Sequence, residues 1–218
     1  MKGLLIKDLR LLFGQTRFFI VVSLFGICFM ITNENPISGM SYITMLFSIF
    51  TLSTISYDEY DNGMAFLMTL PIDRKIYAKE KYVFAIGITL ISAVISSIIA
   101  ITIAKMMSIS VSVKELLVTG IVVIALVSLI LAISIPIEIK FGAEKGRIAM
   151  ILVTGMLIGI GALIVKGSDF LGINLIEWIG KILQLDKIIL SIIGFILWCV
   201  IMSLSYCICV NILKKKQF

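Results

Sequence analysis

Residues 82–104 read YVFAIGITLISAVISSIIAITIA, a run of 23 residues that contains no Asp, Glu, Lys or Arg. A helix of about 20 apolar residues crosses the roughly 30 Å hydrocarbon core of a bilayer. In lipid each backbone N–H and C=O must be bonded within the protein, and a helix satisfies this requirement by itself. The stretch therefore predicts a membrane-spanning helix and places the chain among the membrane proteins.

Five more gaps between charged residues show the same pattern along the 218-residue chain: 18–33, 35–57, 116–137, 148–165 and 188–213. With residues 82–104 they predict an all-α membrane protein with six transmembrane helices, in one domain that spans residues 1–218. The composition agrees, because 60% of the residues are hydrophobic, 15% are charged and the mean hydropathy is +1.15. So large an apolar surplus has to face lipid.

The basic residues fix the predicted orientation. Fourteen of the nineteen lysines and arginines fall in the N-terminal segment, in the loops after the second and fourth spans, and in the C-terminal tail. Cytoplasmic loops carry such an excess, so we expect both termini in the cytoplasm. The net charge of +6 then meets anionic lipid head groups. No basic face accompanies stacking aromatics, which argues against a nucleic-acid partner.

Two segments outside the spans are expected to lie on the membrane surface. Residues 1–17 predict an amphipathic interfacial helix, with a solvated tail as the alternative. Its apolar face would carry Leu5, Leu9, Leu12 and Phe13, opposite Lys7 and Arg10. Residues 166–187, on the outer side, mix apolar and charged residues around Trp178 and predict a re-entrant or interfacial helix.

Residues 57–81 form a predicted cytoplasmic loop that contains more charged, aromatic and turn-forming residues than a simple connector needs. Gly63 and Pro71 bracket Met64–Leu70, a segment long enough for two helical turns. Proline ends this segment, because the residue before it is pushed out of the helical region. Asp73 can then cap the helix that follows. The pattern predicts a short stiff helix across the cytoplasmic mouth, and an interfacial turn without a partner is the alternative.

The loop at Pro136–Arg147 joins the fourth and fifth spans. Pro136 is expected to close the fourth span, and Gly142 and Gly146 allow tight turning. Glu138 can pair with lysines of the same loop near the membrane surface. A purely structural hairpin explains the same residues.

Mildly polar residues inside the second and third spans are candidates for a translocation path: Ser48, Thr51, Ser92 and Ser96. Hydrogen bonds between helices are the alternative role. The gaps hold no ionisable residue, which argues against an ion-coupled carrier. The chain has no histidine and its four cysteines all lie in apolar runs, so no metal site is predicted.

Three stretches of the sequence resemble the ABC-2-type permeases, the membrane subunits of ATP-binding-cassette exporters. These are Ser56-Tyr57-Asp58-Glu59, Leu70–Lys75 with Tyr77 and Lys81-Tyr82, and Pro136–Arg147. Family members carry similar "YDE…LPxxRxxYxxxKY" and "P…KFGxEKxR" stretches at these places. The topology matches over nearly the whole chain, and the motifs cover about thirty residues.

The resemblance implies a partner ATPase and a coupling role for the loop at 57–81. Two six-span permeases, either two copies or this chain beside a related one, would bind two cytoplasmic ATPase subunits that hold ATP and Mg²⁺. The residues expected to transmit the motion are Asp58, Glu59, Pro71, Arg74 and Lys75. The chain itself has no GxxxxGK[ST] phosphate loop and so binds no cofactor.

The resemblance also implies a class of cargo and a location. Similar permeases export amphipathic peptides, such as phenol-soluble modulins or bacteriocins, across the cytoplasmic membrane of Gram-positive bacteria. A non-transporting immunity or sensor protein that binds antimicrobial peptides is the rival interpretation. An intramembrane enzyme is disfavoured, because the gaps contain neither histidine nor aspartate.

Overall fold

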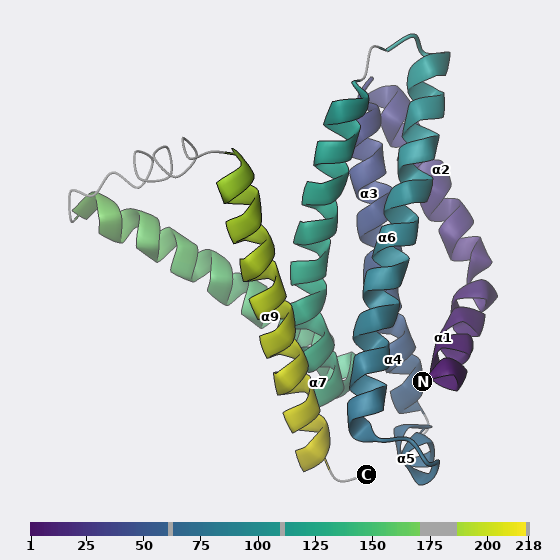
Figure 1. Ribbon diagram of the computed structural model, residues 1–218, viewed down its shortest axis with the longest axis vertical. Coiled ribbons are helices and arrows are strands. Elements are labelled where there is room, and N and C mark those ends of the chain that lie inside the picture. The colour runs from purple at the N-terminus through teal and green to yellow at the C-terminus, as the bar shows by residue number, and fades with distance from the viewer. Residues whose placement is uncertain (61–62, 110–111, 171–186, 217–218) are drawn as a thin grey trace.

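The computed structural model describes residues 1–60, 63–109, 112–170 and 187–216, and for most of residues 143–170 and for residues 187–190 it describes the backbone alone. Within these ranges the regular structure is helical, with no strand, as the predicted all-α class requires. The elements in chain order are α1 (Lys2–Gly14), α2 (Thr16–Thr32), α3 (Pro36–Ile49), the 3₁₀ turn η1 (Phe50–Leu52), α4 (Ser53–Glu59), α5 (Gly63–Thr69), α6 (Arg74–Met106), α7 (Val113–Phe170) and α9 (Lys187–Lys215) (Figure 1).

Four helical segments of the described chain are long and apolar enough to cross a membrane: Pro36–Glu59, Arg74–Met106, Val113–Gly142 and Ser191–Lys215. They correspond to the predicted second, third, fourth and sixth spans. The first predicted span is α2, which joins α1 at a bend of 63°, and the bent pair counts as a fifth candidate.

The predicted total of six spans stays a prediction. The fifth span at 148–165 falls in the second arm of α7, most of whose side chains are outside the description. The predicted surface segment at 166–187 is likewise untested, because residues 171–186 lie outside the described ranges.

Two glycines let α2 and α3 approach each other closely. A Cβ atom on Gly39 would lie 2.6 Å from the carbonyl oxygen of Gly26, and one on Gly26 would lie 2.3 Å from Cγ1 of Ile43. Small residues at such crossings allow helices in lipid to gain van der Waals contact that larger side chains would prevent. Gly26 and Gly39 therefore set the distance between the two helices.

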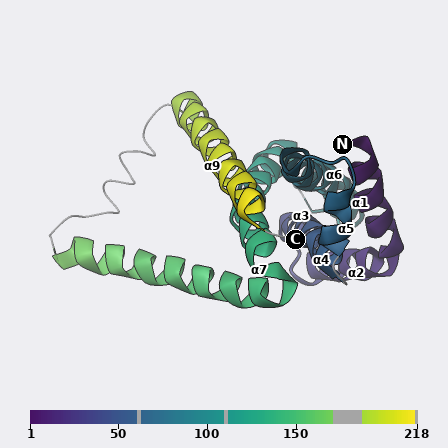
Figure 2. The ribbon, with the colours of Figure 1, turned by 90° about the horizontal axis from the view of Figure 1, so that it is seen from below.

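The long helix α6 organises the bundle. It packs along α3 and also contacts α1, α2, α7 and α9. Seen along the bundle in Figure 2, α1 and α2 lie on one side of α3 and α6, and α9 lies on the other. The amino terminus, the carboxyl end of α9 and α5 lie toward the same end of the bundle (Figure 1), which we call the α5 end.

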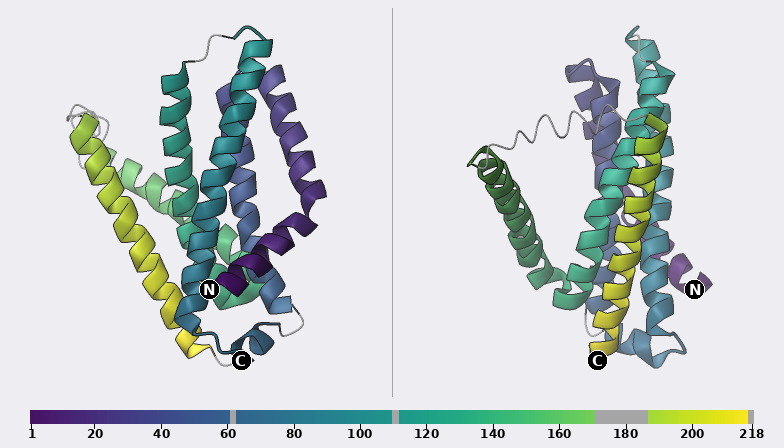
Figure 3. Two further views of the ribbon diagram at one scale, coloured as in Figure 1. Left: turned by 45° about the vertical axis from the view of Figure 1, so that its right-hand side comes forward. Right: turned by 60° about the vertical axis from the view of Figure 1, so that its left-hand side comes forward.

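The helix α7 breaks at Gly142, not at Pro136. The expectation that Pro136 closes the fourth span is wrong, because the helix continues through this proline. Membrane helices tolerate a proline where neighbouring groups satisfy the freed backbone carbonyl. Gly142 adopts φ 76° and ψ 175°, a conformation that suits glycine alone, and the second arm of α7 turns away from the bundle there (Figure 3).

Candidate functional site

The short helix α5 (Gly63–Thr69) lies across one end of the bundle. Its bounds agree within one residue with the predicted segment Met64–Leu70, and Pro71 follows it as expected. Met64 is buried in the apolar core, whereas the Phe66 side chain is 69% exposed. A Cβ atom on Gly63 would lie 2.9 Å from the carbonyl oxygen of Asp58, so α5 sits tightly against the end of α4. The helix is anchored on one face and presents an aromatic side chain on the other.

The next helix begins as predicted but without the predicted bond. α6 starts at Arg74, and Asp73 occupies the N-cap position. The Asp73 side chain makes no capping hydrogen bond, so this part of the expectation is wrong. The start of α6 is instead attached to the end of α9 through the hydrogen bonds of Arg74.

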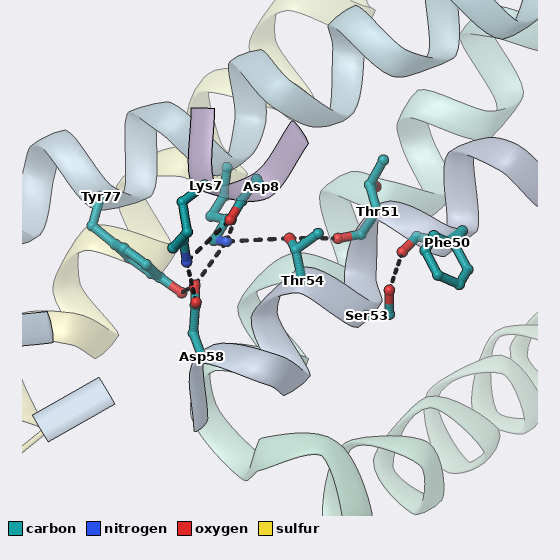
Figure 4. Close-up of polar contacts among 9 residues, drawn as sticks. Lys7, Asp8, Phe50, Thr51, Ser53, Thr54, Asp58 and Tyr77 are labelled. Atoms are coloured by element: carbon teal, nitrogen blue, oxygen red, sulfur yellow. Dashed lines mark hydrogen bonds and ion pairs between the residues drawn. The ribbon is translucent and has the colours of Figure 1, made fainter. Parts of the chain in front are cut away.

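Next to α5, three helices meet around buried ion pairs (Figure 4). Lys81 of α6 places Nζ 2.5 Å from Oδ2 of Asp8 on α1 and 2.8 Å from Oδ2 of Asp58 on α4. Lys7 donates to Asp58 and lies 3.0 Å from Asp8. Tyr77 of α6 donates to Asp58 at 3.0 Å. We call Lys7, Asp8, Asp58, Tyr77 and Lys81 the charge cluster.

The charge cluster is internally compensated. Its two lysines offset its two aspartates, and Thr54 lies 3.1 Å from Lys81 Nζ as a further partner. Asp8 and Lys81 are almost fully buried. A buried ion pair is stable only where each charge keeps its partners, and removing one partner costs about 3–5 kcal/mol. The cluster therefore fixes α1 and α4 against α6 in one arrangement.

The contacts of α1 show which of its residues face the bundle, and they leave the predicted apolar face toward the membrane untested. The residues that face the bundle are Leu4, Asp8 and Leu12, while Leu9 and Phe13 are exposed. Leu12 alone of the predicted apolar face is buried, and Lys7 points into the charge cluster instead of away from it. The prediction assigned Asp8 to no face, and its i±4 spacing from Leu4 and Leu12 is the signal that could have placed it on the inward face.

The carboxyl end of α9 is tied to the end of α4, to the start of α6 and to α7. Lys216 places Nζ 2.5 Å from Oε1 of Glu59 and 2.8 Å from the carbonyl oxygen of Ile139. Arg74 donates from one guanidinium nitrogen to the carbonyl oxygens of Leu213 and Lys214, both at 2.8 Å. Terminal helix carbonyls lack partners within their own helix, so Arg74 caps α9.

The two sequence stretches that carry the motifs, at the end of α4 and in α7 after Pro136, also contact each other. Ser56 donates to Oε1 of Glu138 at 2.5 Å, which links α4 to α7. A Cβ atom on Gly142 would lie 2.6 Å from Oε2 of Glu59, so the break in α7 makes room for that carboxylate. Segments 82 residues apart in sequence thus form one structural unit at the α5 end.

The structure divides the predicted coupling residues into two groups. Asp58, Glu59 and Arg74 make contacts within the chain, to the charge cluster or to the end of α9. Pro71 and Lys75 are exposed at the α5 end, like Phe66. A cavity of about 500 Å³ takes one lining residue from each group, Arg74 and Lys75, and its other lining residues are Met68, Ile72, Asp73 and Lys214.

The four residues predicted to line a translocation path are buried, and each hydroxyl makes a hydrogen bond within the protein. Ser48 and Ser92 donate to the carbonyl oxygens of Thr44 and Thr89 on their own helices, at 2.6 and 3.0 Å. The further bonds join Thr51 to the Ser48 carbonyl at 2.6 Å and the hydroxyls of Ser96 and Thr44 at 2.8 Å. Ser92 also borders an apolar cavity of about 310 Å³ between α1, α2 and α6. Their role in transport stays a prediction.

Comparison with known families gives one match. The model described as "ABC-2 family transporter protein" matches residues 3–214, nearly the whole chain. No curated protein and no solved structure matches.

Proposed function

The chain belongs to the ABC-2 family of transporter proteins, and from this premise we propose that it is the membrane subunit of an ABC exporter driven by a separate cytoplasmic ATPase. The observation that carries the proposal is α5, a short helix fixed across one end of the bundle with Phe66 exposed. Large aromatic side chains dominate the binding energy of protein interfaces in which they become buried. Here Phe66 would seat in the ATPase.

Transmission through the chain follows the contacts of α5. On one side Gly63 abuts the end of α4, which carries Asp58 of the charge cluster. On the other side the chain continues into Arg74, which caps α9. A displacement of α5 would therefore reach α1, α6 and α9 together. ATP and Mg²⁺ on the partner would drive this displacement, and the packed helices would shift as rigid bodies.

The proposed topology places the α5 end in the cytoplasm, with both termini there and six spans in all. Two observations support it. The lysine and arginine excess lies at this end, and α1, α4, α6 and the end of α9 are held together there by Lys7, Arg74 and Lys216. Residues 1–17 would then lie at the inner surface of a bacterial, and by resemblance Gram-positive, cytoplasmic membrane.

The proposed cargo is an amphipathic peptide such as a phenol-soluble modulin or bacteriocin. The apolar cavity beside α1, which Leu9, Phe13 and Ser92 line, supports this class because it opens near the predicted inner membrane surface. An immunity or sensor protein that binds such peptides without transporting them is the alternative. Stimulation of an ATPase by the peptide separates the two, because a sensor without an ATPase gives none.

A matched pair of variants tests the assignment of α5. The ATPase that co-purifies with the tagged chain from its native membrane is identified first, and Phe66→Ala is then compared with Met106→Ala. Met106 is 85% exposed at the opposite end of α6. We expect Phe66→Ala to lower ATPase retention by roughly tenfold or more, as loss of an interface aromatic does, and Met106→Ala to leave it unchanged. Equal retention in both variants would remove α5 from the interface.

A further inference from the structure

A groove between α7 and α9 at the α5 end has a lining that is cationic at one end and apolar at the other. It encloses about 440 Å³ and is lined by Lys140, Ile208, Asn211, Ile212, Lys215 and Lys216. Three of these six residues are lysines, and none of the described lining residues is acidic. The groove is separate from α5, from the charge cluster and from the cavity beside α1.

One of the three lysines is already engaged by the protein. Lys216 bonds to Glu59 and to the Ile139 carbonyl, so its charge is compensated within the chain. Lys140 and Lys215 are exposed, and Lys140 Nζ lies 4.9 Å from the centre of the Phe141 ring. Two ammonium groups on different helices thus remain at the mouth of the groove, which creates a site of positive potential.

Beyond Ile208, where the lining of the groove ends, exposed apolar residues continue along both helices as an apolar stripe. On α9 the residues that share a face with Lys215 at helical spacing are Ile208, Leu204 and Ile201, all exposed. On α7 the exposed Ile133 lies two turns before Lys140. Both helices are among the segments able to span a membrane, so the stripe runs along them into the hydrocarbon.

We propose that this groove binds an anionic phospholipid, with the head-group phosphate between Lys140 and Lys215 and an acyl chain along Ile208 and Leu204. The charge supports a phosphate, and the stripe supports an acyl chain, which a free phosphate lacks. The inference requires only that α7 and α9 cross the membrane and that their α5 ends lie at its surface.

Occupancy of the groove would affect the position of α9. Lys216 lines the groove and at the same time binds Glu59 of α4 and the Ile139 carbonyl of α7. A lipid seated between Lys140 and Lys215 adds a bridge between α7 and α9 at the level of that contact. The bound lipid would therefore hold together the helix ends that meet at the α5 end.

The test compares two double variants that remove equal charge. Lys140→Gln with Lys215→Gln removes the proposed phosphate contacts, and Lys105→Gln with Lys114→Gln removes two exposed lysines at the opposite end of the bundle. The detergent-purified full chain is stripped of lipid and offered phosphatidylglycerol or phosphatidylcholine. Bound lipid is then counted by native mass spectrometry. The double variant Lys140→Arg with Lys215→Arg retains both positive charges. It tests whether a loss of binding comes from the lost charge and not from a folding defect caused by changing these two positions.

We expect the wild-type chain, the Lys105/Lys114 variant and the arginine variant to prefer phosphatidylglycerol. The Lys140/Lys215 glutamine variant should lose this preference by about 30-fold, the effect of two lysines near an anionic surface. Equal preference in both glutamine variants, or equal binding of the two lipids by the wild type, would overturn the proposal. Full competition by glycerol phosphate, which has no acyl chain, would do the same, because the site would then bind the free anion.

Discussion

At the α5 end of the bundle six helices meet around ionised and hydrogen-bonded side chains, whereas at the opposite end four helices meet around methionine, isoleucine and glycine. The first region holds Asp8, Asp58 and Lys81 beside an apolar core from α1, α4, α5, α6, α7 and α9. The second is built from Met30, Met40 and neighbouring apolar residues of α2, α3, α6 and α7.

If α5 seats in an ATPase as proposed, this difference indicates where the chain would respond to it. Ion pairs and capping bonds are directional and depend on a specific partner, so a displaced α5 changes them in a defined way. Close packing of small and apolar side chains depends on shape and transmits displacement as a rigid unit. We infer that the α5 end receives the displacement caused by the ATPase. The opposite end keeps α2, α3 and α6 together while that displacement passes through the bundle.

The comparison predicts its largest effect at the charge cluster. Replacing Lys81 with methionine leaves Asp8 buried without its closest cation and should lower the free energy of unfolding by about 3–5 kcal/mol. The measurement is thermal unfolding in detergent. Lys79→Met is the matched control, because Lys79 is exposed two residues away on the same helix. Equal melting of the two variants would show that the cluster does not hold the α5 end together.

A smaller effect is expected at the opposite end. A methyl group on Gly39 would meet Cγ of Met30 at 2.2 Å and the Gly26 carbonyl oxygen at 2.6 Å. Gly39→Ala should therefore cost about 1–3 kcal/mol, the usual cost of overpacking. At Gly87 the space around a methyl group is open, so Gly87→Ala should be nearly neutral in the same melting assay. If Gly39→Ala is also neutral, α2 and α3 are not in close contact.

The break in α7 is predicted to matter by about 1–3 kcal/mol. Gly142→Ala places a side chain at φ 76° and ψ 175°, a region that costs a residue other than glycine about this much, and its methyl group would press on Glu59. At Gly146 the nearest atom to a methyl group is 3.6 Å away, so Gly146→Ala is the control. Chemical denaturation of the two variants measures the difference. Similar midpoints would contradict the assigned backbone conformation.

The smallest effect on stability is expected at Glu59. Its pair with Lys216 is partly exposed, and such pairs contribute at most about 1 kcal/mol. Glu59→Gln should therefore melt nearly like the wild type, while the proposed coupling predicts a fall in ATPase stimulation. Lys216→Gln should lower ATPase stimulation to a similar extent. The double variant should lose little more stimulation than either single variant. Additive losses would show that the two residues act separately.

Local patterns in the sequence predicted those features whose causes are local. Uncharged gaps gave the positions of α3, α6, the first arm of α7 and α9, and Gly63 with Pro71 gave α5. The pairing of Asp8 with Lys81 spans 73 residues and leaves no periodic signal, so it was not predicted. Arg74 was expected to couple to the ATPase, and its bonds to two carbonyl oxygens of α9 were not foreseen. Those bonds follow only from the fold, which brings the end of α9 beside Arg74.

The location of the α5 end relative to the membrane decides the account most directly, and site-specific labelling measures it. In a chain whose four native cysteines are replaced by serine, Phe66→Cys and Lys114→Cys are treated with a membrane-impermeant maleimide. The account predicts that position 114 reacts in intact cells, whereas position 66 reacts only in inverted vesicles and is protected once the ATPase is bound. Reaction of position 66 from outside intact cells would contradict the account.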